Sequence, residues 1–131
     1  MAPLGAAVRY VAALSPKFHW VGIYILKKNI LELGPFIGEP TEHTRIPVGT
    51  GVCGTAVAEN SDQNVPDVTR VPNYLSCSMK TRSELVVLVR DKRGRVLGQI
   101  DIDSHLPEAF GPEEEKAVRK IADELGVLWP A

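Results

Sequence analysis

Two neighbouring stretches of the sequence decide the fold: RSELVVLVR at residues 82–90 and RVLGQIDIDS at residues 95–104. Both are rich in β-branched and aliphatic residues, and the polar segment DKRG at 91–94 separates them. Strand-like runs joined by a short polar turn that contains glycine are typical of an antiparallel β-hairpin. The chain is therefore predicted to be built around a hairpin of two long strands.

The second strand of this hairpin carries polar residues at alternate positions. Because side chains alternate across a strand, Gln99, Asp101 and Asp103 share one face, and the isoleucines between them point to the other. A two- or four-residue loop centred on residues 92 and 93 places Glu84 directly opposite Asp101. Like charges in opposition destabilise a sheet, so three carboxylates on one face indicate a bound cation or a shared proton. The alternative is a solvated face of an edge hairpin, and a three-residue loop would turn Glu84 to the other face.

The composition is that of an ordinary globular protein. The chain has 131 residues, of which 44% are hydrophobic and 24% charged, and its net charge is −1. This favours one domain over residues 1–131. Charges of both signs are spread along the chain, so neither nucleic acid nor an anionic membrane surface is an expected partner. No apolar run is long enough to span a bilayer and the N-terminus lacks a secretory pattern, so we expect a cytoplasmic protein.

Periodicity and turn residues divide the rest of the chain into short elements. Tight turns connect most of the strands, which favours a mainly antiparallel sheet. The predicted fold class is α+β, with helices on one face of the sheet and a loop-covered ligand pocket on the other. The expected elements are a helix within residues 1–15, strands at 19–26, 30–33 and 45–48, a helix at 52–59, an edge strand at 64–68, loops at 34–44 and 67–82, and a final helix at 112–129.

The predicted pocket has aromatic walls and an acidic floor. Trp20 and Tyr24 are two of the residues that alternate with the aliphatic side chains of the first strand, so they lie on the face that also carries the acids. Core packing is the more frequent role of such aromatic residues. Their common face with the carboxylates favours a place in the pocket instead.

The chain has two cysteines, Cys53 and Cys77. A reducing compartment favours free thiols, and the cysteine spacing fits no zinc site, so neither a metal nor a cofactor is predicted. Cys77 lies in the long loop over the pocket, where carboxylates raise the pKa of a thiol. The alternative role for Cys77 is that of a small buried hydrophobic side chain. Cys53 begins the short helix, where the helix dipole lowers the pKa of a thiol, although a packing role is the simpler interpretation. The two thiols can form a dithiol–disulfide couple if the fold brings them within bridging distance.

Several motifs resemble one family in both sequence and order. The chain carries WVGIY at 20–24, LGPFIG at 33–38, GVCGTA at 51–56, SELVV at 83–87 and DIDS at 101–104. These motifs resemble the GAF-domain family of free methionine-(R)-sulfoxide reductases. The resemblance implies a GAF fold, a homodimer, and reduction of free methionine-(R)-sulfoxide by a cysteine thiol through a sulfenic acid and a disulfide. It also implies a thioredoxin-like reductant.

The resemblance assigns roles to the residues that match the family's motifs. Cys77 matches the cysteine that attacks the sulfoxide, and Cys53 matches the family's non-essential middle cysteine. The matching substrate-binding residues are Glu84, Asp101 and Asp103, which hold the substrate and assist the departing oxygen, and Trp20 and Tyr24, which surround its methyl end.

One departure from the family bears on turnover. The family's usual resolving cysteine lies in the loop after Gly-Pro-Phe, whereas here that loop reads EPTEH at 39–43. Recycling therefore depends on Cys53 or on an external thiol. The alternatives to an enzyme are a non-catalytic GAF module that binds a small ligand and a redox-sensing module with a Cys53–Cys77 disulfide.

Overall fold

The computed structural model describes residues 2–72 and 80–130. Ten elements follow one another along the chain, and their order is close to the one expected from the sequence. They are α1 (Ala2–Ala12), β1 (Trp20–Lys27), β2 (Ile30–Ile37), β3 (Arg45–Pro47), α2 (Gly51–Glu59), β4 (Gln63–Val65), the 3₁₀ turn η1 (Val68–Arg70), β5 (Ser83–Arg90), β6 (Val96–Ser104) and α3 (Pro112–Leu128).

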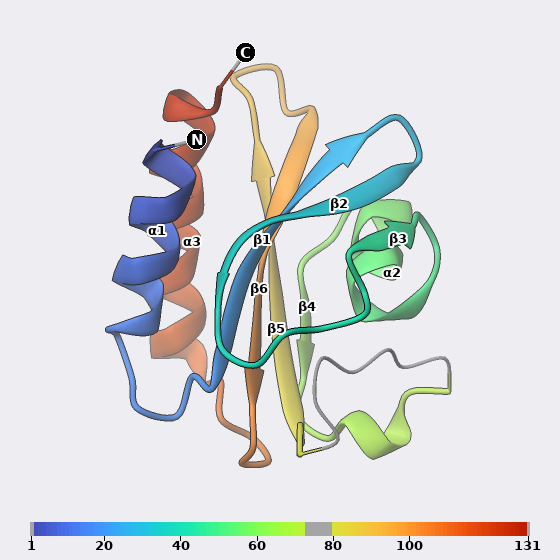
Figure 1. The fold of residues 1–131 in the computed structure, drawn as a ribbon, viewed down its shortest axis with the longest axis vertical. Coiled ribbons are helices and arrows are strands. Elements are labelled where there is room, and N and C mark those ends of the chain that lie inside the picture. The colour runs from blue at the N-terminus through green and yellow to red at the C-terminus, as the bar shows by residue number, and fades with distance from the viewer. Residues whose placement is uncertain (1, 73–79, 131) are drawn as a thin grey trace.

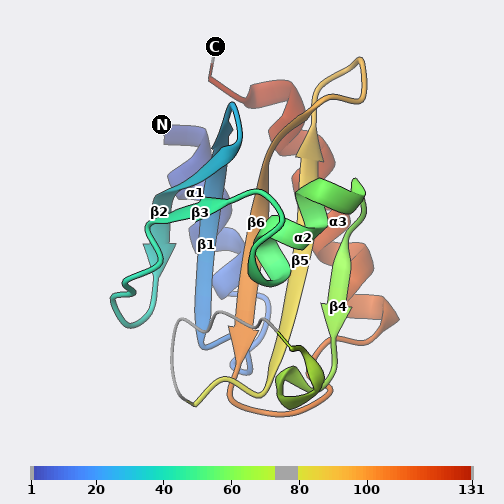
Figure 2. The same ribbon diagram turned by 90° about the vertical axis from the view of Figure 1, so that its right-hand side faces the viewer.

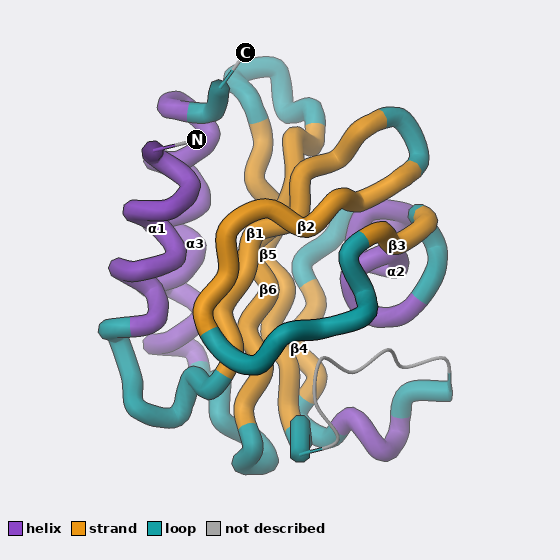
Figure 3. The backbone as a smooth tube through the Cα atoms, viewed as in Figure 1, coloured by secondary structure: helices purple, strands orange, loops and turns teal. Residues whose placement is uncertain are grey.

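The strands form one antiparallel sheet in the order β3-β2-β1-β6-β5-β4. Helices α1 and α3 lie side by side on one face, and α2 lies on the other (Figures 1 and 3). Figure 2 shows α2 in front of the sheet, with α1 and α3 behind it. The α+β class is confirmed, and α2 adds a helix to the pocket face. Within the described ranges, no helix has both the length and the apolar character needed to cross a bilayer.

Each face of the sheet packs an apolar layer. On the α1/α3 side, Val21 and Ile23 of β1 and Ile100 and Ile102 of β6 are almost fully buried. On the α2 side, a second buried cluster joins Trp20 and Tyr24 to residues of β2, β3, α2 and β5, namely Leu31, Ile46, Val52, Cys53, Ala56, Val86 and Leu88. The alternation predicted for β1 and β6 is therefore confirmed. The face that carries the acids is buried beneath α2 rather than open to solvent.

The pairing of β5 with β6 differs from the expected one by two residues. Glu84 lies opposite Asp103, and Asp101 lies opposite Val86. The expectation that Glu84 faces Asp101 directly was wrong for two reasons. The turn is centred on Arg93, which shifts the pairing by one residue, and the ladder slips by one further residue between Val89 and Arg90. In the turn that follows, the carboxylate of Asp91 accepts hydrogen bonds from the backbone N–H groups of residues 93 and 95. A shift of two residues preserves the face, so all three carboxylates still point to the same side.

Strand β2 is longer than expected. The glycine and proline at 34 and 35 predicted a loop, but the strand continues to Ile37. The β1–β2 register shifts between Gly22 and Tyr24, opposite this glycine–proline pair. Proline is tolerated at such an irregularity because a ladder hydrogen bond is already missing there.

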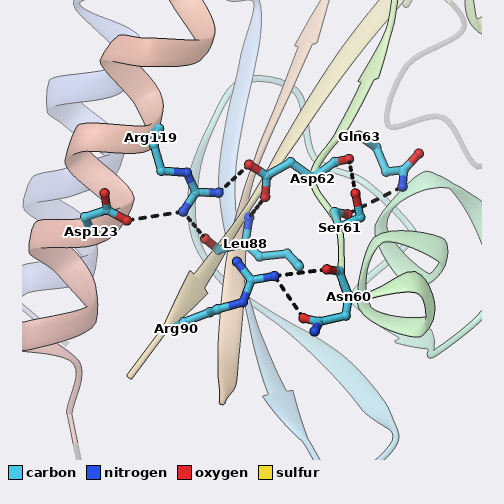
Figure 4. A network of polar contacts seen from close by, with 8 residues as sticks. All are labelled: Asn60, Ser61, Asp62, Gln63, Leu88, Arg90, Arg119 and Asp123. Atoms are coloured by element: carbon cyan, nitrogen blue, oxygen red, sulfur yellow. Dashed lines mark hydrogen bonds and ion pairs between the residues drawn. The ribbon is translucent and has the colours of Figure 1, made fainter. Parts of the chain in front are cut away.

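A polar network ties the end of the sheet to α3 (Figure 4). Asp62, just before β4, accepts a hydrogen bond of 2.8 Å from the backbone N–H of Leu88 and forms an ion pair with Arg119 of α3. Arg119 also donates to the backbone oxygen of Leu88 at 3.0 Å and to Asp123 at 3.3 Å. The network satisfies the backbone of β5 beyond Val86, the residue that pairs with the first residue of β4. It thereby joins helix, sheet and the segment that follows α2.

Candidate functional site

Three carboxylates form the floor of the candidate site. Glu84 is supplied by β5, and Asp101 and Asp103 are supplied by β6. Each residue is no more than 2% exposed. Burial of several carboxylates is costly unless protons, hydrogen bonds or a cation compensate their charge. The charge of this floor is therefore compensated by protons, by hydrogen bonds or by a bound cation.

Trp20 and Tyr24 form one wall of the site and bind the segment between β2 and β3, which covers the site. The rings of Trp20 and Tyr24 lie 6.4 Å apart between centroids. The indole N–H of Trp20 donates to the backbone oxygen of Glu39 at 3.0 Å. The hydroxyl of Tyr24 donates to the backbone oxygen of His43 at 2.8 Å. These bonds fasten the segment between β2 and β3 across the face of β1. The EPTEH stretch is thus part of the wall of the site.

Helix α2 brings Cys53 to the acidic floor. The thiol sulfur lies 3.8 Å from Oε2 of Glu84. The side-chain amide of Gln99 donates to the backbone oxygen of Cys53 at 3.0 Å and fixes the start of the helix to β6. The sequence did not predict this contact with Gln99. The one feature of the sequence that pointed to this contact was the alternation along the strand, which puts Gln99 on the same face as Asp101 and Asp103.

The surroundings of Cys53 correct the expectation for its thiol. The helix start predicted a lowered pKa, but burial, followed by the charges of Asp101 and Glu84, raises the pKa of Cys53 well above its ordinary value. The loss of water and the neighbouring negative charge outweigh the dipole of a short helix. The resting form of Cys53 is the neutral thiol.

The carboxyl group of Asp101 is buried close to Glu84 and Cys53. Burial raises the pKa of Asp101, and hydrogen bonds with Glu84 and Cys53 oppose that rise. The raised pKa favours the protonated form of Asp101, which can then donate a proton to a ligand in the site.

A small cavity reaches this cluster from the α2 side. Its lining combines aromatic, aliphatic and acidic groups with the backbone before α2: Tyr24, His43, Ile46, Thr50, Gly51, Val52, Cys53 and Asp101. Six of the site residues predicted from the sequence lie on one side of the sheet around the acidic floor: Trp20, Tyr24, Cys53, Glu84, Asp101 and Asp103. Cys77 lies outside the described residues.

Comparison with known proteins agrees with this architecture. The family model for the GAF domain matches residues 7–129. The chain belongs to the GAF-domain family. The match covers all three helices and the whole sheet apart from the first residues of α1.

Several relatives of this GAF domain are named reductases. It is 39% identical over 107 residues to the free methionine-R-sulfoxide reductase of Escherichia coli, covering 82% of this chain and 64% of that protein. The match to the GAF domain-containing protein A of Dictyostelium discoideum is 41% over 113 residues and covers 84% of this chain and 70% of that protein. The chain thus spans about two thirds of the length of these curated relatives.

Solved structures of GAF-domain proteins have the same fold as this chain. The type II free methionine-R-sulfoxide reductase of Thermoplasma acidophilum superimposes with a TM-score of 0.91 at 42% identity, over 95% of this chain and 88% of that one. The Staphylococcus aureus protein, solved in complex with its substrate, superimposes with a TM-score of 0.85 at 32% identity, over 94% of this chain and 79% of that one. The fold predicted from the motifs is confirmed.

Proposed function

We propose that this GAF domain reduces free methionine-(R)-sulfoxide to methionine. The observation that carries the proposal is the group of buried carboxyls on the pocket face, where Asp101, Glu84 and the thiol of Cys53 lie close together and burial raises the pKa of Asp101. Sulfoxide reduction needs a proton donor at the departing oxygen and a thiol at the sulfur. Relatives named for this reaction, one of them solved with its substrate, support the same conclusion.

The proposed roles follow the chemistry of the substrate. The ammonium group of a free amino acid lies between the buried carboxyl groups of Glu84 and Asp103 and offsets their negative charge in part, and Trp20 and Tyr24 surround the methyl end. A peptide-bound sulfoxide lacks that ammonium group, so the acidic floor selects the free amino acid. Asp101, whose pKa is raised by burial, donates a proton to the sulfoxide oxygen.

In the first step the thiol of Cys77 attacks the sulfoxide sulfur. The sulfur–oxygen bond of the substrate breaks, methionine forms, and Cys77 becomes a sulfenic acid that carries the oxygen. A second thiol then condenses with the sulfenic acid, which releases water and leaves a disulfide. A thioredoxin-like dithiol supplies the two electrons that return this disulfide to two thiols.

Cys53 is the proposed resolving thiol. Its position on the acidic floor, with the thiol sulfur 3.8 Å from Oε2 of Glu84, supports this role. Because the pKa of Cys53 is raised, a neighbouring carboxylate has to accept the thiol proton during condensation. Resolution at Cys53 is consistent with a covering segment that has no cysteine at residues 39–43.

We further propose that residues 1–131 act as one GAF-like domain in a cytoplasmic homodimer. A groove between α1 and α3 supports a second copy as its occupant, because Tyr10 and Leu128 on its sides are 64% and 61% exposed. Lys120 and Glu124 line the same groove one helical turn apart, so two antiparallel copies of α3 bring each lysine near the other copy's glutamate.

A single-turnover assay on reduced protein tests the function. The substrates are the free (R) epimer, the free (S) epimer and a peptide-bound sulfoxide, with thiols counted before and after. Methionine from the free (R) epimer alone, with two thiols lost per chain, is the expected result. Loss of only one thiol per chain would mean that an external thiol, and not Cys53, reacts with the sulfenic acid. No methionine from any of the three would leave the alternative, a ligand-binding or redox-sensing GAF module.

A further inference from the structure

Three donor atoms of complementary chemistry converge on the pocket floor. The thiol sulfur of Cys53 and one carboxylate oxygen each from Glu84 and Asp101 all lie within 4.8 Å of one another, and all three residues are buried. The sulfur and Oε2 of Glu84 are 3.8 Å apart. Donors that share a tetrahedral Zn²⁺ lie about 3.5 Å apart, given Zn–S and Zn–O bonds of roughly 2.3 and 2.1 Å. Small side-chain adjustments therefore bring the three donors onto one ion.

An unpaired atom points to a ligand at the same place. Oδ1 of Asp101 has no hydrogen-bond partner among the described residues, although Asp101 is only 1% exposed. A buried acceptor without a partner is costly, and such atoms are rare in folded proteins. Asp101 and Cys53 both line the small cavity on the α2 side, which gives a ligand a place beside them.

We propose that Cys53, Glu84 and Asp101 bind a thiophilic divalent cation, with Zn²⁺ as the preferred ion, when the organic substrate is absent. The thiolate selects Zn²⁺ over Mg²⁺ or Ca²⁺, which prefer oxygen ligands. Binding releases the protons of the Cys53 thiol and the Asp101 carboxyl group to solvent, and the ion then neutralises two of the three negative charges of its ligands. A fourth coordination position is left for water or chloride.

The site has a consequence for the proposed reductase. The ion occupies the carboxylates that hold the substrate's ammonium group and binds the thiol proposed to resolve the sulfenic acid. Zn²⁺ is therefore a competitive inhibitor that also shields Cys53 from oxidation. This consequence rests on the proposed function, whereas metal binding itself does not.

The alternation on β6 indicated a cation or a proton at the acidic face, but the place of Cys53 beside it was not predictable because the ligands come from three separate elements. Cys53 lies on α2, Glu84 on β5 and Asp101 on β6, so no short spacing links them. Known zinc motifs are recognised by ligands a few residues apart. Here the packing of α2 on the sheet brings the donors together.

Titration of the reduced, chelator-treated chain with Co²⁺ tests the site through its absorption spectrum. Co²⁺ bound by a thiolate gives a sulfur-to-metal charge-transfer band in the near ultraviolet, so the expected result is a band that saturates at one ion per chain. Cys53→Ser should remove the band, and the matched variant Cys77→Ser should keep it. Asp101→Asn, which keeps the size of the side chain, should raise the Co²⁺ dissociation constant at least about tenfold. An equimolar amount of Zn²⁺ should displace the cobalt and abolish the band.

Other outcomes overturn the proposal. Absence of the band in the unaltered chain, or its loss in Cys77→Ser, would exclude Cys53 as the thiolate ligand. If Cys53→Ser fails to fold, an unchanged dissociation constant in Asp101→Asn would exclude the site. Methionine formation is measured separately: a zinc site in a chain without reductase activity would refute the function and leave the metal proposal standing. In an active chain, Zn²⁺ should raise the apparent KM for the sulfoxide at constant kcat, and an unchanged KM would refute the competition.

Discussion

Glu84 of β5 lies directly opposite Asp103 of β6, and both side chains are buried. Directly opposed like charges destabilise a pair of strands, and burial increases that cost. The opposition places two carboxylates at the spacing of a single cross-strand pair, with Asp101 two residues further along the same face of β6. A ligand that brings positive charge to this face relieves the repulsion, whereas a neutral ligand does not.

Glu84→Gln tests that electrostatic role. The substitution keeps the shape of the side chain and removes its charge, so binding of free methionine-(R)-sulfoxide should weaken at least about tenfold. Calorimetric titration in a Cys77→Ser background measures this affinity without turnover. The matched control is Glu32→Gln on β2, where the carboxylate forms ion pairs with Lys27 and Arg45 near the surface and the affinity should not change. Unchanged or tighter binding in Glu84→Gln would show that Glu84 does not hold an ammonium group.

Cys53→Ser separates the first chemical step from recycling. The variant keeps the nucleophile, so one turnover should produce the same amount of methionine as the unaltered chain. Repeated turnover with a thioredoxin-like reductant should slow at least about tenfold, because no thiol within the chain remains to form the disulfide. The measurement compares the methionine burst with the steady-state rate. Equal steady-state rates would exclude Cys53 from recycling.

The acidic floor was predictable because it depends on local geometry. A strand has a period of two, so the spacing of Gln99, Asp101 and Asp103 alone places them on one face. The exact partner of Glu84 was not predictable. It depends on a slip at Arg90 and on a turn organised by the side chain of Asp91, and neither changes the alternation pattern.

Contacts between distant segments were harder to predict than the face of a strand on which each side chain lies. Cys53 and Glu84 are 31 residues apart, and they meet only because α2 folds onto the sheet. That packing buries Cys53 and reverses the pKa shift expected from its place at a helix start. The bonds from Trp20 and Tyr24 to backbone oxygens of the covering segment likewise link elements that no sequence period relates.

Two helical glycines should respond in opposite ways to alanine. A Cβ at Gly126 of α3 would lie 2.2 Å from the backbone oxygen of Arg90, so Gly126→Ala should destabilise the fold by about 1–3 kcal/mol. At Gly5 of α1 the nearest atom is the end of the Arg9 side chain at 3.5 Å, and Gly5→Ala should stabilise the fold by roughly 0.5–1 kcal/mol. Urea denaturation measures both. Stabilisation by Gly126→Ala would contradict the close approach of α3 to β5.

Asp62 should be more important for stability than its surface position suggests. Asp62→Ala removes the acceptor of the Leu88 N–H and one anionic partner of Arg119, so the free energy of unfolding should fall by about 1–3 kcal/mol. Asp123→Ala removes the other anionic partner of the same arginine, but the side chain of Asp123 is 67% exposed. That control should change stability by no more than about 0.5 kcal/mol. Equal effects of the two variants would show that the backbone contact is not what stabilises this edge of the sheet.

His105 should titrate below the ordinary range of histidine. Its ring stacks on His19 with centroids 3.9 Å apart, and its backbone N–H donates to Nδ1 of His19 at 3.0 Å. Partial burial lowers the pKa of His105, and the charges of His19 and Lys80 lower it further, while Glu39 opposes them. Between this lowered pKa and the ordinary value of about 6.5, the unfolded chain binds more protons than the folded one. Stability should therefore increase as pH rises through that window and decrease as pH falls through it.

Titration by NMR of the His105 ring, in the folded chain and in urea, checks the direction of this shift. The midpoint of the folded chain should be the lower of the two. In His19→Gln the ring loses a neighbour that can become positively charged, so the midpoint of His105 should rise toward the value in urea. His105→Gln should flatten the dependence of unfolding free energy on pH in the same window. A midpoint above the value in urea would mean that Glu39, rather than burial and His19, dominates the surroundings of the ring.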